Sequence, residues 1–135
     1  MKEELWNLEQ NEYNSKDNRK YETLFTLANG YRGLRGTLEF SSIGERGNFI
    51  SGIFDKSDAQ VTEIVNCQDP LGFNVCFEDE QLDFDRCNIL KFKRRLNMKE
   101  GILYLSAAVE TEKGKRVKIE SERYVSQKSI HRWAD

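Results

Sequence analysis

The sequence predicts an all-β fold, an antiparallel β-sandwich of short strands, and three observations support this prediction. From Tyr21 onward, apolar and polar residues alternate with a period of two in short segments, which is typical of half-buried strands. Turn-forming residues separate these segments. After the N-terminal region, no segment has a convincing 3.6-residue period, so we expect no long helix.

The polar first twenty residues, with Trp6 and Leu8 as their apolar positions, are compatible with either a helix or a strand. Eight strands are expected after them, at Glu22–Ala28, Leu34–Phe40, Asn48–Phe54, Gln60–Asn66, Gly72–Glu78, Asn88–Met98, Ile102–Glu110 and Lys115–Gln127. In the last of these, Val117 and Ile119 alternate with charged residues, which a helix would scatter around its axis. Turns are expected at Asp69–Gly72, Glu78–Glu80, Lys99–Gly101 and Glu112–Gly114.

Length and charge limit the possible classes of protein. The 135 residues are enough for one domain, residues 1–135, with a hydrophobic core. The formal net charge is −2, which argues against a nucleic-acid partner. The N-terminus has no apolar signal segment and no run approaches the length of a membrane span. We therefore expect a cytoplasmic protein with no membrane partner.

The cysteines and the histidine offer no metal or cofactor motif. Cys67, Cys76 and Cys87 are an odd set without a CxxC pair, and we expect them to be reduced and mostly packed. His131 is the single histidine, so a histidine-rich metal site is excluded and no Ser/His/Asp constellation can be assembled. We expect no metal and no bound cofactor.

Gly30, Gly33 and Gly36 fall within eight residues, more densely than glycine occurs elsewhere in the chain. Gly30 and Gly33 fit the GxxG loop of KH domains, but that loop joins two helices and these flanks are predicted strands. The phosphate-loop patterns GxGxxG and GxxxxGK[ST] do not occur here. Two interpretations stay open: a tight strand-to-strand corner, or a loop that contacts an anionic or polyhydroxylated group.

Paired carboxylates could indicate glycosidase chemistry. The candidates are interpreted as solvated surface residues, and they are Glu39, Glu45, Asp55, Asp58, Glu63, Asp79, Glu80, Asp83 and Asp85. The basic segment Lys91–Arg95 alternates with an aromatic residue, so it is predicted to be a strand with one charged face.

The segment Glu22–Gly36, with the sequence ETLFTLANGYRGLRG, resembles the N-terminal signature of glycoside hydrolase family 65, roughly E-S-L-F-T-L-G-N-G-Y-x-G-x-R-G. Four further segments resemble later motifs of the family in the same order, namely Asn48–Asp55, Glu63–Pro70, Arg95–Gly101 and Glu120–Ser126. The resemblance covers about residues 6–133. The departures are Ala28 for a usual glycine, Asn97 for a usual aspartate, and Cys67 near a usual leucine.

That family contains maltose, trehalose, kojibiose and nigerose phosphorylases. The resemblance implies a β-supersandwich of the galactose-mutarotase-like type, followed by a helical linker and a catalytic α/α barrel that holds the general acid. Inorganic phosphate, the co-substrate, attacks the anomeric carbon with inversion. We expect this chain to be the first part of the sandwich without the barrel, and inactive alone. The choice between phosphorolysis and hydrolysis, and the identity of the disaccharide, depend on residues of the barrel.

No catalytic residue is carried onto this chain by the resemblance. The positions expected to contact sugar, or the neighbouring catalytic barrel, are Asn29, Tyr31, Arg32 and Arg35. Asparagine and arginine can bond to hydroxyls or phosphate, and tyrosine can stack on a pyranose ring. The expected partners are the barrel, an α-linked glucose disaccharide and further copies of the chain.

Two alternative functions stay open. The first is a self-standing carbohydrate-binding module, with an aromatic platform from Trp6, Tyr31, Tyr104 or Trp133. The second is a structural or oligomerisation domain, because a partial sandwich leaves strand edges unpaired and such edges recruit other chains.

Overall fold

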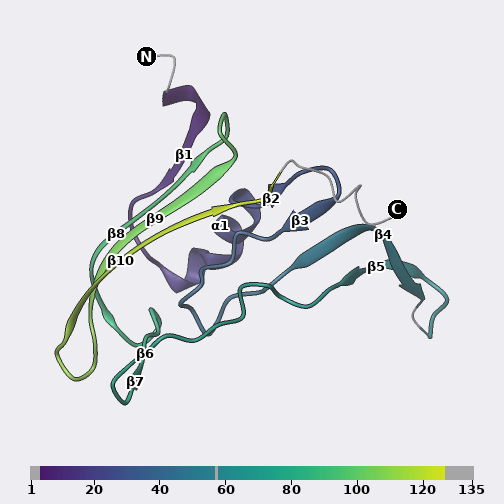
Figure 1. The fold of residues 1–135 in the computed structure, drawn as a ribbon. Coiled ribbons are helices and arrows are strands. Elements are labelled where there is room, and N and C mark those ends of the chain that lie inside the picture. The colour runs from purple at the N-terminus through teal and green to yellow at the C-terminus, as the bar shows by residue number, and fades with distance from the viewer. Residues whose placement is uncertain (1–3, 57, 127–135) are drawn as a thin grey trace, which may run out of the picture.

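The computed structural model describes residues 4–56 and 58–126, which form antiparallel strands and one short α-helix (Figure 1). The elements in chain order are η1 (Glu4–Trp6), β1 (Asn7–Gln10), η2 (Ser15–Asp17), α1 (Asn18–Leu24), β2 (Leu27–Ala28), β3 (Arg32–Leu34), β4 (Asn48–Lys56), β5 (Thr62–Asn66), β6 (Cys76–Phe77), β7 (Glu80–Gln81), β8 (Asn88–Asn97), β9 (Ile102–Glu110) and β10 (Arg116–Tyr124). The predicted all-β antiparallel class is confirmed.

The described strands form two four-stranded sheets and one small hairpin. The long sheet has the order β1-β8-β9-β10, the short sheet has the order β2-β3-β4-β5, and β6 pairs with β7. Every pairing is antiparallel. Strands β4, β5, β8, β9 and β10 lie where the alternation predicts them, although the predicted residue Gln127 lies outside the described residues.

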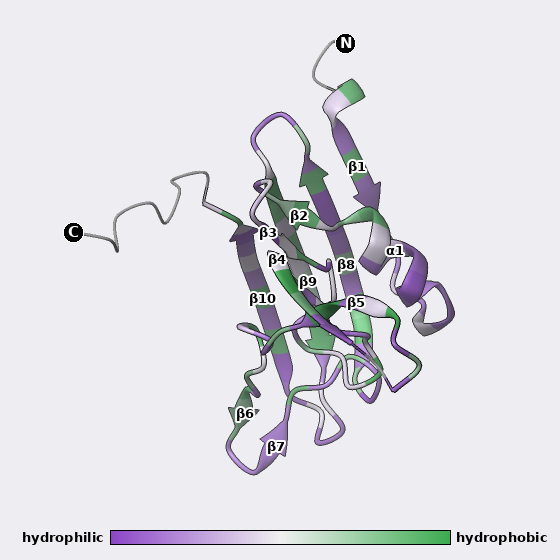
Figure 2. Ribbon diagram, turned by 90° about the vertical axis from the view of Figure 1, so that its right-hand side faces the viewer, coloured by the Kyte–Doolittle hydropathy of each residue, from purple (hydrophilic) through white to green (hydrophobic). Residues whose placement is uncertain are grey.

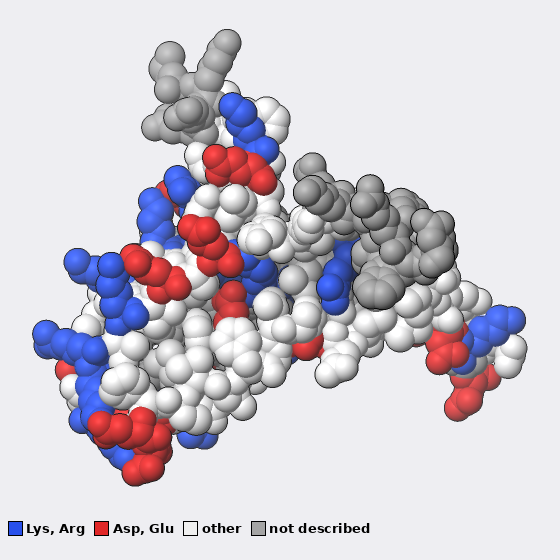
Figure 3. Space-filling view, viewed as in Figure 1, with Lys and Arg blue, Asp and Glu red and all other residues white. Residues whose placement is uncertain are grey.

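One face of the long sheet carries the larger hydrophobic cluster. Buried positions alternate along β8, β9 and β10, and Figure 2 shows hydrophobic stretches recurring along these strands. The cluster joins them to two loop segments, and its members are Leu38, Leu82, Phe84, Phe92, Leu105, Ala107, Val109 and Ile119. Acidic and basic side chains intermingle along the flank of the molecule that the long sheet forms (Figure 3). The period-two pattern therefore separates a packed face from a charged one.

The predicted strand Glu22–Ala28 is wrong in its first half. Helix α1 (Asn18–Leu24) occupies those positions, and strand β2 contains only Leu27–Ala28. The rings of Tyr21 and Phe25 stack with their centroids 5.6 Å apart, which is a contact between neighbours on one helix face. The alternation of apolar residues in this segment predicted a strand, although Tyr21 and Phe25 also have the i, i+4 spacing of a helix.

The predicted strand Leu34–Phe40 is also wrong beyond its first residue, where β3 ends. The carbonyl groups that follow bond to arginine side chains rather than to a neighbouring strand. Arg94 Nη2 donates to Gly36 O at 2.6 Å, and Arg123 Nη2 donates to Thr37 O at 2.7 Å. Because these arginines lie far along the chain, local alternation could not predict that the ladder would end here.

The predicted strand Gly72–Glu78 shrinks to the two residues of β6, Cys76 and Phe77. The β6–β7 hairpin lies off the main core, and Cys76 is exposed, which contradicts its predicted packing. Cys67 and Cys87 are partly buried, and all three thiols are free.

Candidate functional site

The glycine-rich run forms the hairpin that joins β2 to β3. Asn29 N donates to Arg32 O at 3.2 Å and closes a loop with Gly30 and Tyr31 at its tip. Gly30 has φ +84°, in the left-handed region that favours glycine. The Asn29 side-chain oxygen accepts hydrogen bonds from the backbone of Tyr31 at 2.9 Å and of Arg32 at 2.7 Å. The predicted strand-to-strand corner is confirmed.

The structure places Asn29, Tyr31 and Arg32 in this hairpin and Arg35 directly after it, and it gives the four predicted site residues different surroundings. Asn29 Nδ2 donates to Ser126 O at 2.8 Å, which ties the loop to the chain after β10. Arg32 Nε donates to Asn48 Oδ1 at 2.7 Å. Tyr31 is 48% exposed at the tip. Tyr31 is therefore the member best placed to meet a partner, while the others organise the loop.

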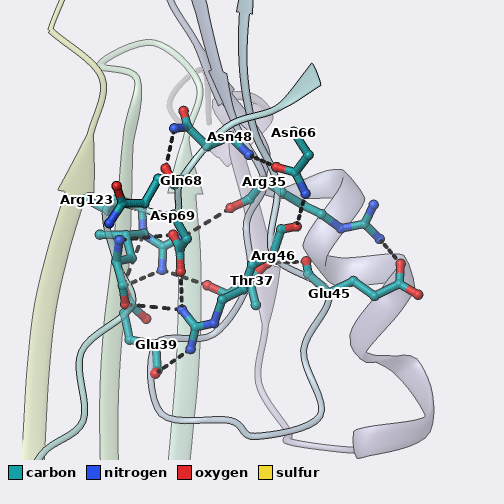
Figure 4. A network of polar contacts seen from close by, with 11 residues as sticks. Arg35, Thr37, Glu39, Glu45, Arg46, Asn48, Asn66, Gln68, Asp69 and Arg123 are labelled. Atoms are coloured by element: carbon teal, nitrogen blue, oxygen red, sulfur yellow. Dashed lines mark hydrogen bonds and ion pairs between the residues drawn. The ribbon is translucent and has the colours of Figure 1, made fainter. Parts of the chain in front are cut away.

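Asn48, which accepts the hydrogen bond from Arg32, is itself held inside the short sheet by contacts with Asn66 and Gln68 (Figure 4). It is 2% exposed, and its Nδ2 donates to Gln68 O at 2.7 Å. Its backbone nitrogen donates to Asn66 Oδ1 at 2.9 Å. Because Asn48 is buried and bonded to these partners, its side chain is held in place, and its Oδ1 in turn positions the Arg32 guanidinium.

Arg35 lies between two carboxylates. Its Nε is 3.5 Å from Glu22 Oε2, and its Nη2 is 3.6 Å from Glu45 Oε2. The Glu22 side chain is 2% exposed, whereas that of Arg35 is 26% exposed. Arg19, on helix α1, also pairs with Glu45. Arg35 therefore compensates a buried negative charge, which would be costly alone.

Two arginines from the long sheet reach the end of the glycine-rich run. Arg123 donates through Nη1 to Arg35 O at 3.3 Å and through Nε to Glu39 Oε1 at 3.1 Å, and the Arg123 and Glu39 side chains are 5% and 8% exposed. The Arg94 guanidinium lies 4.8 Å from the centre of the Phe25 ring. Burial lowers the pKa of Arg94 to about 10, so this side chain is charged at neutral pH.

Sequence reasoning missed these two arginines, and it also misjudged the charged face of Lys91–Arg95. Arg94 occupies a buried position between Phe92 and Leu96, so this strand carries a positive charge on its packed face as well. Arg123 similarly shares the buried face of its strand with Ile119. The signal that could have identified Arg94 and Arg123 is that each occupies a position that the alternation of its strand assigns to the apolar face.

The prediction that the nine candidate carboxylates are solvated is wrong for four of them, because Glu39 and Asp83 are buried and Glu80 and Asp85 are partly buried. Glu39 is paired with Arg123, and Asp83 is 6% exposed with its Oδ1 accepting from Asp85 N at 3.0 Å. Asp85 is partly buried, and it accepts hydrogen bonds from Tyr13 and from Ser41 Oγ. These carboxylates hold loops together, because their oxygens satisfy backbone and side-chain donors.

The buried carboxylates of Glu22 and Glu39 are paired with arginines of the same chain, which gives the site a structural rather than a chemical character. Over residues 4–56 and 58–126, no group of three or more His, Cys, Asp and Glu side chains is arranged to hold a metal ion. In the same described residues, no helix has the length and apolar character needed to cross a membrane. His131 and Trp133 lie outside the described residues.

Known proteins resemble this chain in sequence and in fold. The model of the N-terminal domain of glycosyl hydrolase family 65 matches residues 8–134. A kojibiose phosphorylase from Thermoanaerobacter brockii is 51% identical over 99% of this chain and 17% of that protein. A maltose phosphorylase from Bacillus subtilis (strain 168) is 33% identical over 90% of this chain and 18% of that protein. This chain thus spans less than a fifth of these relatives.

A solved structure from the human microbiome, which carries the provisional name kojibiose phosphorylase, superposes with a TM-score of 0.83. It is 20% identical in sequence, and the match covers 91% of this chain and 18% of that one. At this level of identity the match shows that the two share a fold.

Proposed function

Because this chain belongs to the N-terminal domain family of glycosyl hydrolase family 65, we propose that it is the non-catalytic β-sandwich portion of a disaccharide phosphorylase. The observation that carries the proposal is the match over residues 8–134, combined with the 17% of the relative's length that this chain spans. The whole enzyme would cleave an α-linked glucose disaccharide with inorganic phosphate, in a catalytic barrel outside this chain. Identity of 51% with a kojibiose phosphorylase, against 33% with a maltose phosphorylase, favours kojibiose.

Two features support a role in contact with the rest of an enzyme. Tyr31 projects from a hairpin whose other polar side chains are engaged internally. Strands β4 and β5 and the residue before β5 expose apolar side chains, and the exposed fractions are 42% for Ile53, 58% for Phe54, 54% for Val61 and 46% for Ile64. Exposed apolar clusters of this kind mark interaction surfaces. We infer that the catalytic barrel, or further strands of the sandwich, cover this ribbon, while Tyr31 faces the barrel.

Self-association is the second candidate for this surface, and it is favoured by β5, which is the edge strand of the short sheet that the described residues form. Without its catalytic partner, the chain should pair edge to edge and form a homo-oligomer. Light scattering across a concentration series measures this, and a monomer at every concentration would contradict it.

We also propose a cytoplasmic location, which the three free thiols support because such thiols persist in a reducing compartment.

The experiment that tests the proposed function replaces the matched segment of the Thermoanaerobacter brockii relative with this chain. The chimera should consume kojibiose and phosphate and release glucose 1-phosphate, whereas the same relative with the segment deleted should have little activity. An inactive chimera that is nevertheless folded would refute the assignment.

Within that chimera, Tyr31→Ala tests the hairpin tip. We expect a loss of at least fivefold in kcat/KM with an unchanged melting temperature, because the exposed ring makes few contacts within its own domain. Phe77→Ala, an aromatic residue exposed to a similar extent on the β6–β7 hairpin, is the matched control. Equal kinetics for both variants would remove Tyr31 from the proposal.

A further inference from the structure

The charged face of the long sheet carries a groove formed by two adjoining cavities. One, of about 660 Å³, crosses β8, β9 and β10, and the other, of about 540 Å³, lies between η1 and the β8–β9 turn. Arg95 and Tyr104 line both cavities, so the two adjoin at these residues. Each volume lies in the range of small-molecule sites. We call this the outer-face groove, and it is defined by Trp6, Lys93, Arg95, Lys99, Glu100 and Tyr104.

An aromatic platform stands at the end of the groove nearest the N-terminus. Trp6 is 52% exposed, yet its backbone is fixed because Met98 N donates to Trp6 O at 2.8 Å. Pairing of Asn7 with Asn97 continues the attachment into β1. The indole is therefore held beside the groove on a secured segment, which lowers the entropic cost of using it for binding.

The turn between β8 and β9 presents polar groups in a fixed arrangement. Asn97 Oδ1 accepts hydrogen bonds from Lys99 N at 3.1 Å and Glu100 N at 3.2 Å, and its Nδ2 donates to Glu100 Oε2 at 2.8 Å. Tyr104 OH donates to the same Glu100 oxygen at 3.3 Å. An aspartate at position 97 could not donate to Glu100 and would repel it. The asparagine thus places a carboxylate at the groove.

The charges around the groove identify the class of ligand. The lining includes three basic residues, Lys93, Arg95 and Lys99, and three acidic residues, Glu100, Glu120 and Glu122, so it has no net formal charge. A polyanion or a phosphate would meet equal numbers of like and unlike charges. A hydroxyl group both donates and accepts, and it can use ammonium, guanidinium and carboxylate partners alike. An exposed indole in addition suits the C–H face of a pyranose ring.

We propose that the outer-face groove binds a neutral oligosaccharide, with one pyranose ring stacked on Trp6 and the hydroxyls of the next bonded to Arg95, Lys99 and Glu100. Tyr104 forms part of the floor, where the Arg95 guanidinium lies 4.8 Å from its ring centre. This site involves none of the residues of the Asn29–Arg35 hairpin, and it would operate whether or not the chain serves a phosphorylase. It would hold substrate, or a longer glucan, close to the enzyme without taking part in its chemistry.

The test titrates the intact 135-residue chain with maltotriose and with kojibiose while the indole N–H resonances of its two tryptophans are followed by NMR. The Trp6→Phe variant assigns the Trp6 resonance. We expect saturable shifts of that resonance with either sugar, at least tenfold weaker binding in Trp6→Ala, and at least threefold weaker binding in Glu100→Gln. Phe77→Ala, 51% exposed on a different hairpin, should bind like the unaltered chain.

Three results would overturn the proposal. The first is the absence of saturable shifts with both sugars at tens of millimolar, and the second is equal weakening by Phe77→Ala. The third is displacement of the sugar by inorganic phosphate at equal concentration, because it would indicate an anion site instead. Circular dichroism spectra and melting curves of Trp6→Ala establish that its fold is retained, which the exposure of the ring predicts.

Discussion

Replacing Arg123 by methionine should remove a large part of the stability of this chain. The substitution keeps much of the aliphatic volume but takes away the guanidinium that bonds to Glu39, Arg35 O and Thr37 O. The carboxylate of Glu39, 8% exposed, would then be buried without its ion-pair partner. Two backbone carbonyl groups would also lose the donor that now replaces a strand ladder.

The expected size follows from these contacts. Breaking a buried ion pair by removing one partner costs about 3–5 kcal/mol, because the remaining charge stays in a poorly solvated position. Each carbonyl left without a donor can add about 1–3 kcal/mol. Since the groups belong to one network, these contributions do not add fully, and we expect about 4 kcal/mol in total. That is a large part of the roughly 5–15 kcal/mol that stabilises a typical domain.

Urea unfolding followed by circular dichroism measures the effect. Arg116→Met is the matched control on the same strand, since its exposed pair with Glu110 should contribute less than about 1 kcal/mol. The double variant Arg123→Met with Glu39→Leu should recover about 2 kcal/mol of the loss, because neither buried charge remains. A loss below about 1 kcal/mol in the single variant, or a double variant as unstable as the sum of both single variants, would refute the reasoning.

Three further predictions concern packing and titration. A Cβ added at residue 36 would lie 2.6 Å from the backbone carbonyl carbon of Phe25, so Gly36→Ala should lower the free energy of unfolding in urea by about 1–3 kcal/mol. Gly33→Ala is the control, because a Cβ there would have nothing within 4 Å, and it should lower that free energy by less than about 1 kcal/mol. Burial acts to raise the pKa of Asp85, but hydrogen bonds from Tyr13 and Ser41 lower it below its ordinary value. The ionised Asp85 carboxylate therefore stabilises the fold, and this contribution is lost as the pH falls through the folded-state pKa. Asp85→Asn should accordingly make the free energy of unfolding depend less on pH in the acid range. Burial and the hydrogen bond to Asp85 raise the pKa of Tyr13 to about 12. The free energy of unfolding should therefore fall as the pH rises from about 10, the ordinary pKa of tyrosine. In an ultraviolet titration of tyrosinate formation, Tyr13→Phe should abolish the step at the highest pH.

The alternation of residues predicted the long sheet well because each of its strands has one packed face. Strand β9 spans the predicted Ile102–Glu110, and β8 differs from its prediction only by Met98. Gly101 and Gly114 have positive φ in the turns predicted to contain them. Pattern and structure agree here because neighbouring strands supply nearly all the contacts that define the element.

The region around the glycine-rich run could not be predicted in the same way. Its backbone is held by Arg94 and Arg123, and ion pairs join its Arg35 to Glu22 on helix α1 and to Glu45 in the loop after β3. The sequence predicted the corner that Asn29 and Arg32 close, because an Asn-Gly turn is determined by neighbouring residues. It did not indicate that the Arg32 and Arg35 guanidinium groups would bond to partners within the chain.

The most direct measurement for the central claim is an assay of glucose 1-phosphate formation from kojibiose and phosphate by this chain in trans. Alone, the chain should form none. Mixed with the Thermoanaerobacter brockii relative from which the matched segment has been deleted, it should restore activity that the deleted enzyme lacks. Turnover by the isolated chain, or a deleted enzyme that is folded and fully active without it, would contradict the claim that this chain is a non-catalytic but required domain.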